Sequence, residues 1–219
     1  MGALSTDTPC PIPFHPSLKS YSLPPSEFLV SRPHIGRILS SNIVFHPSPG
    51  PTAPPLTLLL RRAPSDYWPL RWETPGGSLD VDTDPCILAA AVRELREETG
   101  LVAKRAVRCV AVEQEVEGYK TEDGGEVWTF PEPGTGWSWA KITFLMEVEG
   151  EGAGEVVLQD EEHVDSRWVT EEEVRKGKFR GDEGEKIDFV SEVVRLALLE
   201  AFRIKNEELA EEAAATYQQ

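Results

Sequence analysis

The chain has 219 residues, 40% of them hydrophobic, and this length and composition are typical of one globular core with extensions. Its formal net charge is -16. The negative charge argues against binding to nucleic-acid polymers or anionic membranes, and no apolar run is long enough to span a bilayer. Three scattered cysteines and the lack of a secretory signal predict a reducing, cytoplasmic location without a disulfide framework.

The N-terminal part of the chain is rich in proline, since fifteen of the 18 prolines precede residue 76. Residues 1–37 are therefore predicted to form an extended arm outside the main domain, which we place at residues 38–180. Residues 41–46 and 56–60 are apolar enough to be the first two strands. The Pro- and Gly-containing segment 47–55 between them predicts a loop.

A glycine-rich turn and a long helix are predicted next. The turn is Thr74-Pro75-Gly76-Gly77. Asp84 can serve as the N-cap of the helix with Pro85 in its first position, and Gly100 ends it. One face of this helix is apolar and should pack against the core, through Ile87, Leu88, Ala91, Val92 and Leu95.

The other face of this helix carries three carboxylates. Glu94, Glu97 and Glu98 are spaced i, i+3 and i+4, so they lie together and repel one another. A divalent cation relieves that repulsion, and several oxygen ligands suit Mg²⁺ or Mn²⁺. A solvated acidic face is the ordinary alternative.

The next predicted elements are a strand at residues 105–117, a polar, glycine-containing insertion at 118–137 and a strand at 138–147. The insertion and its flanks hold four aromatic residues, Trp128, Phe130, Trp137 and Trp139. Their rings are expected either to stack on a nucleobase or to pack against the sheet.

The C-terminal part is predicted to be mainly helical. A short strand at 165–169 leads into a helix capped at Thr170, with Glu173 as its capping-box partner. The unit 181–219 is predicted to hold a final helix, residues 184–214, which packs on the domain or extends it.

Gly77, together with the run Arg93-Glu94-Leu95-Arg96-Glu97-Glu98-Thr99-Gly100-Leu101, resembles the Nudix box, the signature of enzymes that cleave diphosphate linkages. The family usually has a glutamate eight residues before the arginine, and Pro85 stands there in this chain. The loop from Gly77 to that position is also two residues longer than usual. Asp84, next to Pro85, could substitute for the glutamate.

The resemblance implies an α/β (α+β) fold, in which a mixed sheet lies between helices as an α/β/α sandwich. It implies that Glu94, Glu97 and Glu98 are catalytic residues that ligate Mg²⁺ or Mn²⁺, with the Gly77 carbonyl as a further ligand. Arg93 is then a catalytic-site residue that orients a glutamate.

Many relatives use another acid outside the box as a metal ligand or general base. The candidates here are Glu161, Glu162 and Asp165, and we favour Glu162 as a ligand. Arg61, Arg62 and Arg71 flank the approach to the Pro-Gly-Gly turn. Arg61 and Arg71 are candidate substrate-binding residues, as is Trp139.

The function that the resemblance implies is metal-dependent hydrolysis of a nucleoside diphosphate-linked or similar small molecule. A ligand-binding module without turnover is an alternative that Pro85 favours. A Nudix-fold isomerase or biosynthetic enzyme acting on a diphosphate is another. The resemblance also allows a homodimer, since many relatives dimerise.

Overall fold

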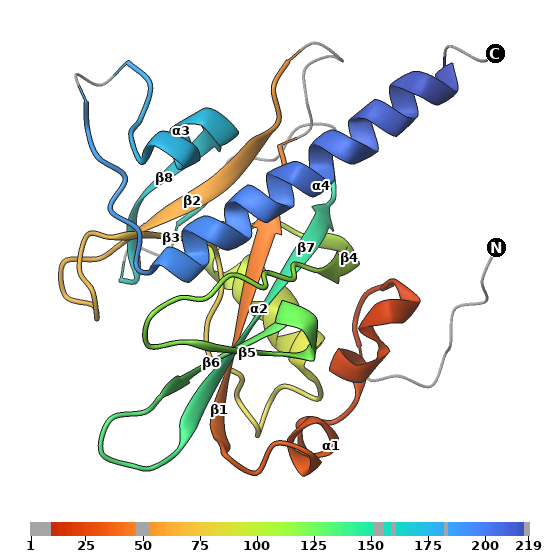
Figure 1. Ribbon diagram of the computed structural model, residues 1–219, viewed down its shortest axis with the longest axis vertical. Helices are drawn as coiled ribbons and strands as arrows, with labels where there is room; N and C mark the ends of the chain where they lie inside the picture. Colours follow the sequence, from red (N-terminus) through yellow and green to blue (C-terminus); the bar gives the residue numbers. More distant parts are fainter. Residues whose placement is uncertain (1–9, 47–52, 151–155, 159–160, 182–183, 217–219) are drawn as a thin grey trace.

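The computed structural model describes residues 10–46, 53–150, 156–158, 161–181 and 184–216. Two sheets and two long helices form its frame (Figure 1). The larger sheet is mixed. Its central strand β7 (Ser138–Val148) runs parallel to β1 (Ile35–Val44). On the other side, β7 pairs antiparallel with β6 (Val127–Pro131) and β4 (Ala103–Cys109), and β5 (Lys120–Glu122) completes the sheet beside β6.

A smaller antiparallel sheet carries part of the cleft described below. Its central strand β2 (Leu56–Arg62) lies between β3 (Trp72–Glu73) and β8 (His163–Thr170). Leu60 lies opposite Glu73 on one side and opposite Ser166 on the other. This register brings chain segments about 90 residues apart to the same end of the sheet.

The two faces of the mixed sheet are covered by different helices. Helix α2 (Ile87–Thr99) belongs to a core cluster with Val44 and Phe144, whereas α4 (Glu192–Thr216) belongs to a second cluster with Ile43 and Leu145. Neighbouring strand residues alternate between the faces, so α2 and α4 pack on opposite sides (Figure 1). The predicted α/β/α sandwich with a mixed sheet is thereby confirmed.

Helix α2 begins two residues later than predicted. Its N-cap is Cys86, whose sulfur accepts a hydrogen bond from the Ala89 amide at 3.4 Å. The prediction that Asp84 is the cap is wrong, because the Asp84 carboxylate is bound to Arg93 instead. Gly100 ends the helix as predicted, in a left-handed conformation with φ 71°.

The N-terminal arm is more regular than the predicted extended segment, and its first nine residues lie outside the described part. It contains a 3-10 helix, η1 (Pro16–Ser22), and a short helix, α1 (Pro25–Val30). Leu18, Tyr21 and Phe28 are buried in the core cluster that contains α2. The Tyr21 hydroxyl donates to Glu126 at 2.6 Å, and the His15 amide donates to the Ala106 oxygen at 3.0 Å, so packing and polar contacts together fix the arm on the domain.

The strand after α2 is shorter than predicted, since β4 ends at Cys109 and residues 110–119 are irregular. The predicted insertion is instead the hairpin β5–β6, joined by the short 3-10 helix η2 (Asp123–Gly125). A Cβ on Gly125 would lie 2.6 Å from the Val112 carbonyl carbon. The Val112 amide donates to the Gly125 oxygen at 3.0 Å and maintains this close approach. The contact keeps residues 110–119 off the path of the strand.

Helix boundaries differ elsewhere for tertiary reasons. The final helix begins at Glu192, not at residue 184, because the Trp72 amide donates to Asp188 oxygen and the Val190 amide donates to Trp72 oxygen.

The first strand begins at Ile35, six residues earlier than predicted, since β7 offers a parallel partner along its whole length. Helix α3 (Glu171–Lys176) carries the predicted Thr170–Glu173 capping box.

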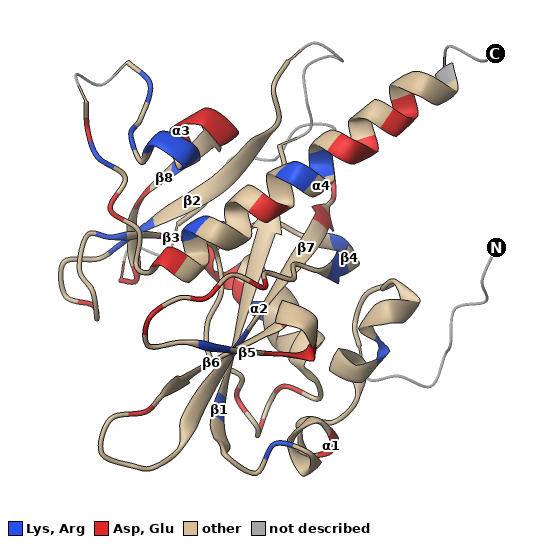
Figure 2. Ribbon diagram, viewed as in Figure 1, with Lys and Arg blue, Asp and Glu red and all other residues tan. Residues whose placement is uncertain are grey.

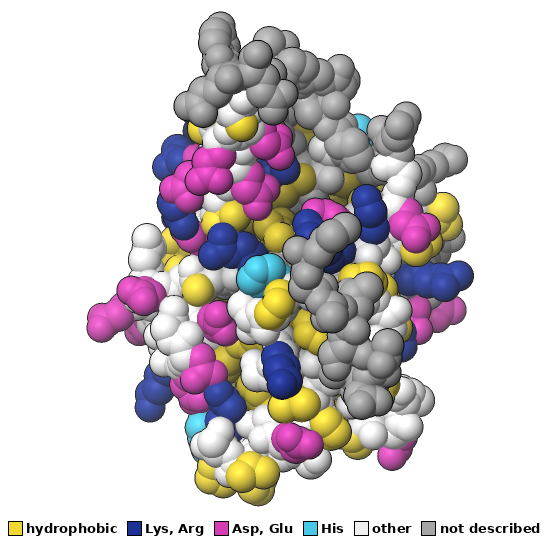
Figure 3. Space-filling view, turned by 90° about the vertical axis from the view of Figure 1, so that its right-hand side faces the viewer, with side chains coloured by type: hydrophobic (Ala, Val, Ile, Leu, Met, Phe, Trp, Pro, Cys, Tyr) yellow, Lys and Arg dark blue, Asp and Glu magenta, His cyan; other side chains and the backbone are white. Residues whose placement is uncertain are grey.

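The surface mixes charges of both signs. Helix α3 carries acidic residues in its first turn and basic residues in its last, and residues of both signs lie along α4 (Figure 2), where they form ion pairs such as Arg203 with Glu200. On the face shown in Figure 3, acidic and basic side chains lie among apolar ones and do not form one uniformly negative field. Among the described residues, no helix has the length and apolarity needed to cross a membrane.

Candidate active site

The glycine-rich turn is fastened to both β1 and α2. The Asn42 amide donates to the Pro75 oxygen at 2.7 Å, and the Asn42 side chain donates to the Ala91 oxygen of α2 at 2.9 Å. Ser41 and Thr74 join their hydroxyl groups at 2.6 Å. These buried hydrogen bonds hold the turn in one position relative to the helix.

Both glycines of the turn are needed because other groups approach them closely. A Cβ on Gly76 would lie 2.2 Å from the Ser40 carbonyl oxygen, and one on Gly77 would lie 2.5 Å from Glu94 Oε1. The Gly76 amide donates to Glu98 Oε2 at 2.6 Å. Close approach of the turn thus brings two carboxylates of α2 directly against its backbone.

Arg93 connects the preceding loop to the helix. Its guanidinium donates from Nε to Asp84 Oδ1 at 3.0 Å and from Nη2 to Asp84 Oδ2 at 2.8 Å. Nη1 reaches Glu97 Oε2 at 2.8 Å and Glu94 Oε1 at 3.0 Å. Asp84, next to Pro85, therefore gives the arginine a bidentate carboxylate partner from the loop.

The carboxylates of α2 differ in their surroundings. Glu98 is buried, and burial together with the nearby charge of Glu73 raises its pKa well above the ordinary glutamate value. Burial also raises the pKa of Glu94, against the opposing effect of Arg93. Glu97 is half exposed and pairs with Arg93, so Glu94 and Glu98 are the two acids of the box that face the turn.

A chain of polar contacts crosses the smaller sheet towards Glu98. Arg62 of β2 donates from Nη1 to Glu73 Oε1 at 2.5 Å, and His163 Nε2 lies 3.2 Å from the same oxygen. His163 Nδ1 lies 3.8 Å from Glu98 Oε1. Asp66, 2.5 Å from Arg62 Nη2, completes the series.

These groups line a cavity of about 990 Å³ that is open to solvent. The acids of its wall are Asp66, Glu73, Glu94, Glu98, Glu132, Glu161 and Glu162. Aromatic side chains line another part of it, namely Tyr67, Trp68, Tyr119, Phe130 and Trp139. The rings of Phe130 and Trp139 are nearly parallel, with their centroids 6.3 Å apart.

Lys141 is the cationic side chain of strand β7 in this cavity. It lies two residues after Trp139, on the same side of the strand, and also lines the wall. Burial lowers its pKa, while the nearby charge of Glu73 opposes that shift. Within the described part of the chain it has no hydrogen bond or ion pair, so its ammonium group is available to an anionic ligand.

The cavity brings together some of the predicted site residues and not others. Gly77, Glu94, Glu98, Glu162 and Trp139 line it. The Gly77 carbonyl accepts a hydrogen bond from the Ser40 amide at 2.9 Å, which leaves its second lone pair for a ligand.

The two predicted arginines take other partners. Arg61 donates to the Leu70 carbonyl at 3.2 Å, and Arg71 pairs with Asp188 at 3.7 Å. Neither lines the cavity, whereas the neighbouring Arg62 does. The four predicted aromatic residues are also divided, because Trp128 is buried in the core, and Trp137 is not among the lining residues.

Sequence reasoning missed Glu73, Lys141 and His163. Weak signals existed, since Glu73 directly precedes the Pro-Gly-Gly turn and Lys141 shares a strand face with Trp139. His163 follows the predicted ligand Glu162. No periodicity in the sequence pairs residues 73 and 163, which meet only through the registers of β3 and β8 on β2.

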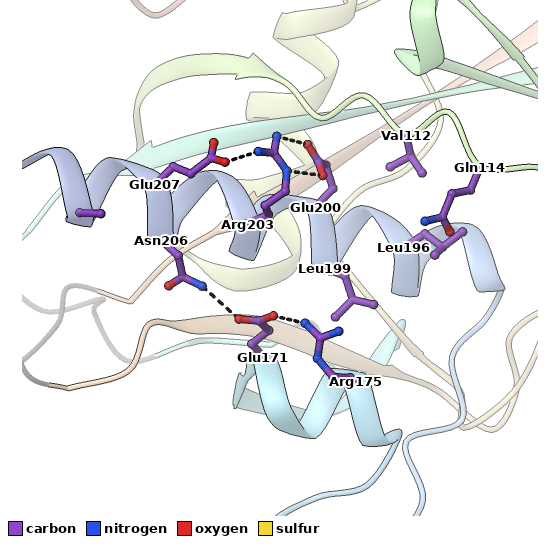
Figure 4. Close-up of a pocket in the computed structure, with 11 residues that line it drawn as sticks. Val112, Gln114, Glu171, Arg175, Leu196, Leu199, Glu200, Arg203, Asn206 and Glu207 are labelled. Carbon is purple, nitrogen blue, oxygen red and sulfur yellow. Dashed lines mark hydrogen bonds and ion pairs between the residues drawn. The ribbon is translucent and has the colours of Figure 1, made fainter.

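A second cavity, of about 530 Å³, lies between α3 and α4 (Figure 4). Its charged side chains bind one another, because Arg203 pairs with Glu200 and Glu207, and Arg175 pairs with Glu171. None of the box acids lines it. We therefore assign the chemistry to the larger cavity.

The donor set of the larger cavity fits a divalent cation. One ligand atom from each of Glu98, Glu162 and His163 lies within 4.8 Å of the others. Burial, together with the like charges of Glu73, Glu94 and Glu162, raises the pKa of Glu98, and a cation would relieve that repulsion. The buried His163 Nδ1 has no hydrogen-bond partner among the described residues, which leaves an unsatisfied donor or acceptor beside these carboxylates.

A glycine turn held against a carboxylate-bearing helix, with a mixed sheet between two helices, defines the class of Nudix domains. A family model described as the NUDIX domain matches residues 47–189, more than half of the chain. The chain belongs to the Nudix hydrolase family.

Solved structures show the same fold. A MutT protein from Methanosarcina mazei is 20% identical over 78% of this chain and 94% of its own, with a TM-score of 0.51. A NUDIX hydrolase from Nitrosomonas europaea is 15% identical over 76% of this chain and 88% of its own, with a TM-score of 0.50. No curated protein matches the chain by sequence.

Proposed function

We propose that this Nudix hydrolase cleaves the phosphoanhydride bond of a small molecule that carries a diphosphate and an aromatic group, such as a nucleoside diphosphate derivative, with Mg²⁺ or Mn²⁺ as cofactor. The observation that carries this proposal is one cavity that combines acids, aromatic side chains and a lysine without a hydrogen bond or ion pair among the described residues. The acids are Glu94, Glu98 and Glu162, and the lysine is Lys141.

The side chains of this cavity have separable roles in the proposal. Glu98, Glu94 and Glu162 would hold the cation, and Glu97 remains a predicted ligand at the exposed edge. Arg93, bound to Asp84, fixes the helix turn that presents Glu94. When bound, the cation would neutralise diphosphate oxygens and lower the pKa of a coordinated water.

The substrate would be positioned by groups of β7 and β6. The ammonium group of Lys141 can bind a phosphate oxygen, because within the described residues the lysine forms no hydrogen bond or ion pair. Trp139 and Phe130 offer aromatic faces on which a base can stack. Arg61 and Arg71 have other partners, so Lys141 and Arg62 are better candidates for phosphate binding.

The test is a panel of nucleoside diphosphates, dinucleotides, nucleotide sugars and non-aromatic diphosphates, each with and without Mg²⁺. Phosphate release would be followed directly, or after phosphatase treatment of the products. We expect magnesium-dependent turnover that favours aromatic substrates and disappears in Glu98→Gln. Turnover that is independent of metal, or that survives in this variant, would contradict the proposal.

The alternative of a binding module without turnover rested on Pro85. The bidentate Asp84–Arg93 pair offsets that departure, because the arginine keeps a buried carboxylate partner. The isomerase alternative rests on a resemblance to enzymes that use a cysteine beside the site, and neither Cys86 nor Cys109 is among the residues that line the cavity.

A further inference from the structure

His163 is placed unusually for a residue in a site of carboxylates. Its side chain is 2% exposed, and it begins β8, where it pairs with Arg62 of β2. The Ala63 amide donates to the Glu162 oxygen at 2.8 Å. The backbone on both sides of the ring is thus fixed by the smaller sheet, while the ring lies at the cavity wall.

The two ring nitrogens have different surroundings. Nε2 lies 3.2 Å from Glu73 Oε1, and this carboxylate is also bound by Arg62. A carboxylate paired with arginine accepts hydrogen bonds, so Nε2 is the nitrogen that carries the proton. Nδ1 has no hydrogen-bond partner among the described residues, and its 3.8 Å separation from Glu98 Oε1 is too long for a hydrogen bond.

This arrangement is the one that metal-binding histidines show. Such a ring donates its second N–H to a carboxylate, which fixes the tautomer and makes the other nitrogen a better ligand. Here Glu73 supplies the carboxylate, and Arg62 holds Glu73 in place. The lone pair of Nδ1 is left 3.8 Å from Glu98 Oε1, and one ligand atom from each of His163, Glu98 and Glu162 lies within 4.8 Å of the others.

Resting on the proposed function, we propose that His163 Nδ1 is a direct ligand of the catalytic cation, together with Glu98 and Glu162, and that the site therefore prefers a first-row transition ion such as Mn²⁺ to Mg²⁺. Imidazole nitrogen suits transition ions, whereas Mg²⁺ takes oxygen ligands. Glu73 and Arg62 are positioning residues that act through the ring.

The test uses the full chain and Mn²⁺ alone as the probe. Continuous-wave electron paramagnetic resonance measures free Mn²⁺ and gives the dissociation constant. Pulsed measurements on the bound ion detect modulation by a coordinated imidazole nitrogen. We expect nitrogen modulation in the unaltered protein and its loss in His163→Gln, with Mn²⁺ binding at least 10-fold weaker by analogy with metal sites that lose a supporting group.

Two further variants separate ligation from structure. In Glu73→Gln, where the ring loses its carboxylate, Mn²⁺ binding should weaken about 10-fold with the nitrogen modulation retained. His34→Gln is the control, since His34 is half exposed and pairs with Glu122 away from the cavity. In His163→Gln, Mg²⁺ affinity, measured by competition with Mn²⁺, should fall less than Mn²⁺ affinity.

The opposing arrangement is a ring protonated on both nitrogens that links Glu73 and Glu98 without touching metal. Bound Mn²⁺ that shows no nitrogen modulation in the unaltered protein would overturn the proposal. That measurement does not require any variant to fold. Nitrogen ligation without turnover on any diphosphate would contradict the proposed function and leave the histidine ligand in place, so the two failures are distinguishable.

Discussion

Replacement of Asp84 by asparagine tests how the departure at Pro85 is compensated. The two side chains have nearly the same shape, so the change removes charge without leaving a cavity. Asp84 Oδ1 accepts from Arg93 Nε, and Oδ2 accepts from both Arg93 Nη2 and the Asp80 amide. An asparagine has an NH₂ group in place of one of these oxygens. The hydrogen bonds that the replaced oxygen accepted are therefore lost.

The size of the effect follows from burial. The Asp84 side chain is 4% exposed and that of Arg93 is 28% exposed. Loss of hydrogen bonds to a charged group costs about 1.5–3 kcal/mol, and breaking a buried ion pair costs about 3–5 kcal/mol. Glu94 and Glu97 still accompany the arginine, so we expect about 2–3 kcal/mol. At about 2–4 °C per kcal/mol for a domain of this size, Tm falls by roughly 4–12 °C.

The assay is thermal unfolding of the metal-free protein, followed by circular dichroism. Glu97→Gln is the matched control, because Glu97 binds the same arginine but is 48% exposed. An exposed pair contributes at most about 1 kcal/mol, so Tm should fall by less than about 4 °C. Equal Tm values for unaltered protein and Asp84→Asn would refute the reasoning, as would a larger fall for Glu97→Gln.

Three further predictions concern the cavity. In Gly77→Ala, the new Cβ would lie 2.5 Å from Glu94 Oε1, so titration calorimetry should show Mg²⁺ binding about 10-fold weaker with Tm nearly unchanged. In Gly76→Ala, Tm itself should fall, because the new Cβ would meet the rigid backbone of β1 at 2.2 Å. A lower Tm for Gly77→Ala with an unchanged Tm for Gly76→Ala would contradict both expectations. Burial raises the pKa of Glu98 above the ordinary value of 4.5. The stability that Glu98 contributes to the metal-free protein is therefore present below pH 4.5 and is lost as the pH rises through the raised pKa. Glu98→Gln should therefore flatten the fall of Tm with pH in this window, and an unchanged slope would be evidence against it. Lys141→Met should remove a charge-assisted contact with phosphate, which contributes about 1.5–3 kcal/mol, and so raise KM by roughly 10–150-fold. We expect kcat to change little, and an unaltered KM would exclude the contact.

Local pattern in the sequence was sufficient for helix α2 and its acids. Apolar spacing, a terminal glycine and carboxylates at i, i+3 and i+4 depend only on helical geometry, so the helix and its two faces were predictable. The capping box at Thr170 is equally local. The fold class was predictable through the resemblance that the box carries.

The tertiary structure decided which polar groups meet. Asp84 was expected to cap α2, but Arg93 lies within reach only once the loop folds back on the helix, and the stronger charge-assisted pair takes the carboxylate. Cys86 then becomes the cap. Arg62 and Glu73 meet as neighbouring strands of the smaller sheet, and strand register is a long-range property.

The contrast has one physical cause. Contacts within a helical turn are set by the backbone period, so the sequence by itself determined the acid-bearing face, the glycine turn and the fold class. Contacts between β2, β3 and β8 depend on how about 90 residues of intervening chain pack, so only the tertiary structure brought His163 beside Glu73 and Glu98. The position of the acid-bearing helix is therefore a local property of this chain, while the other cation ligands that we propose come together only through its folded sheets.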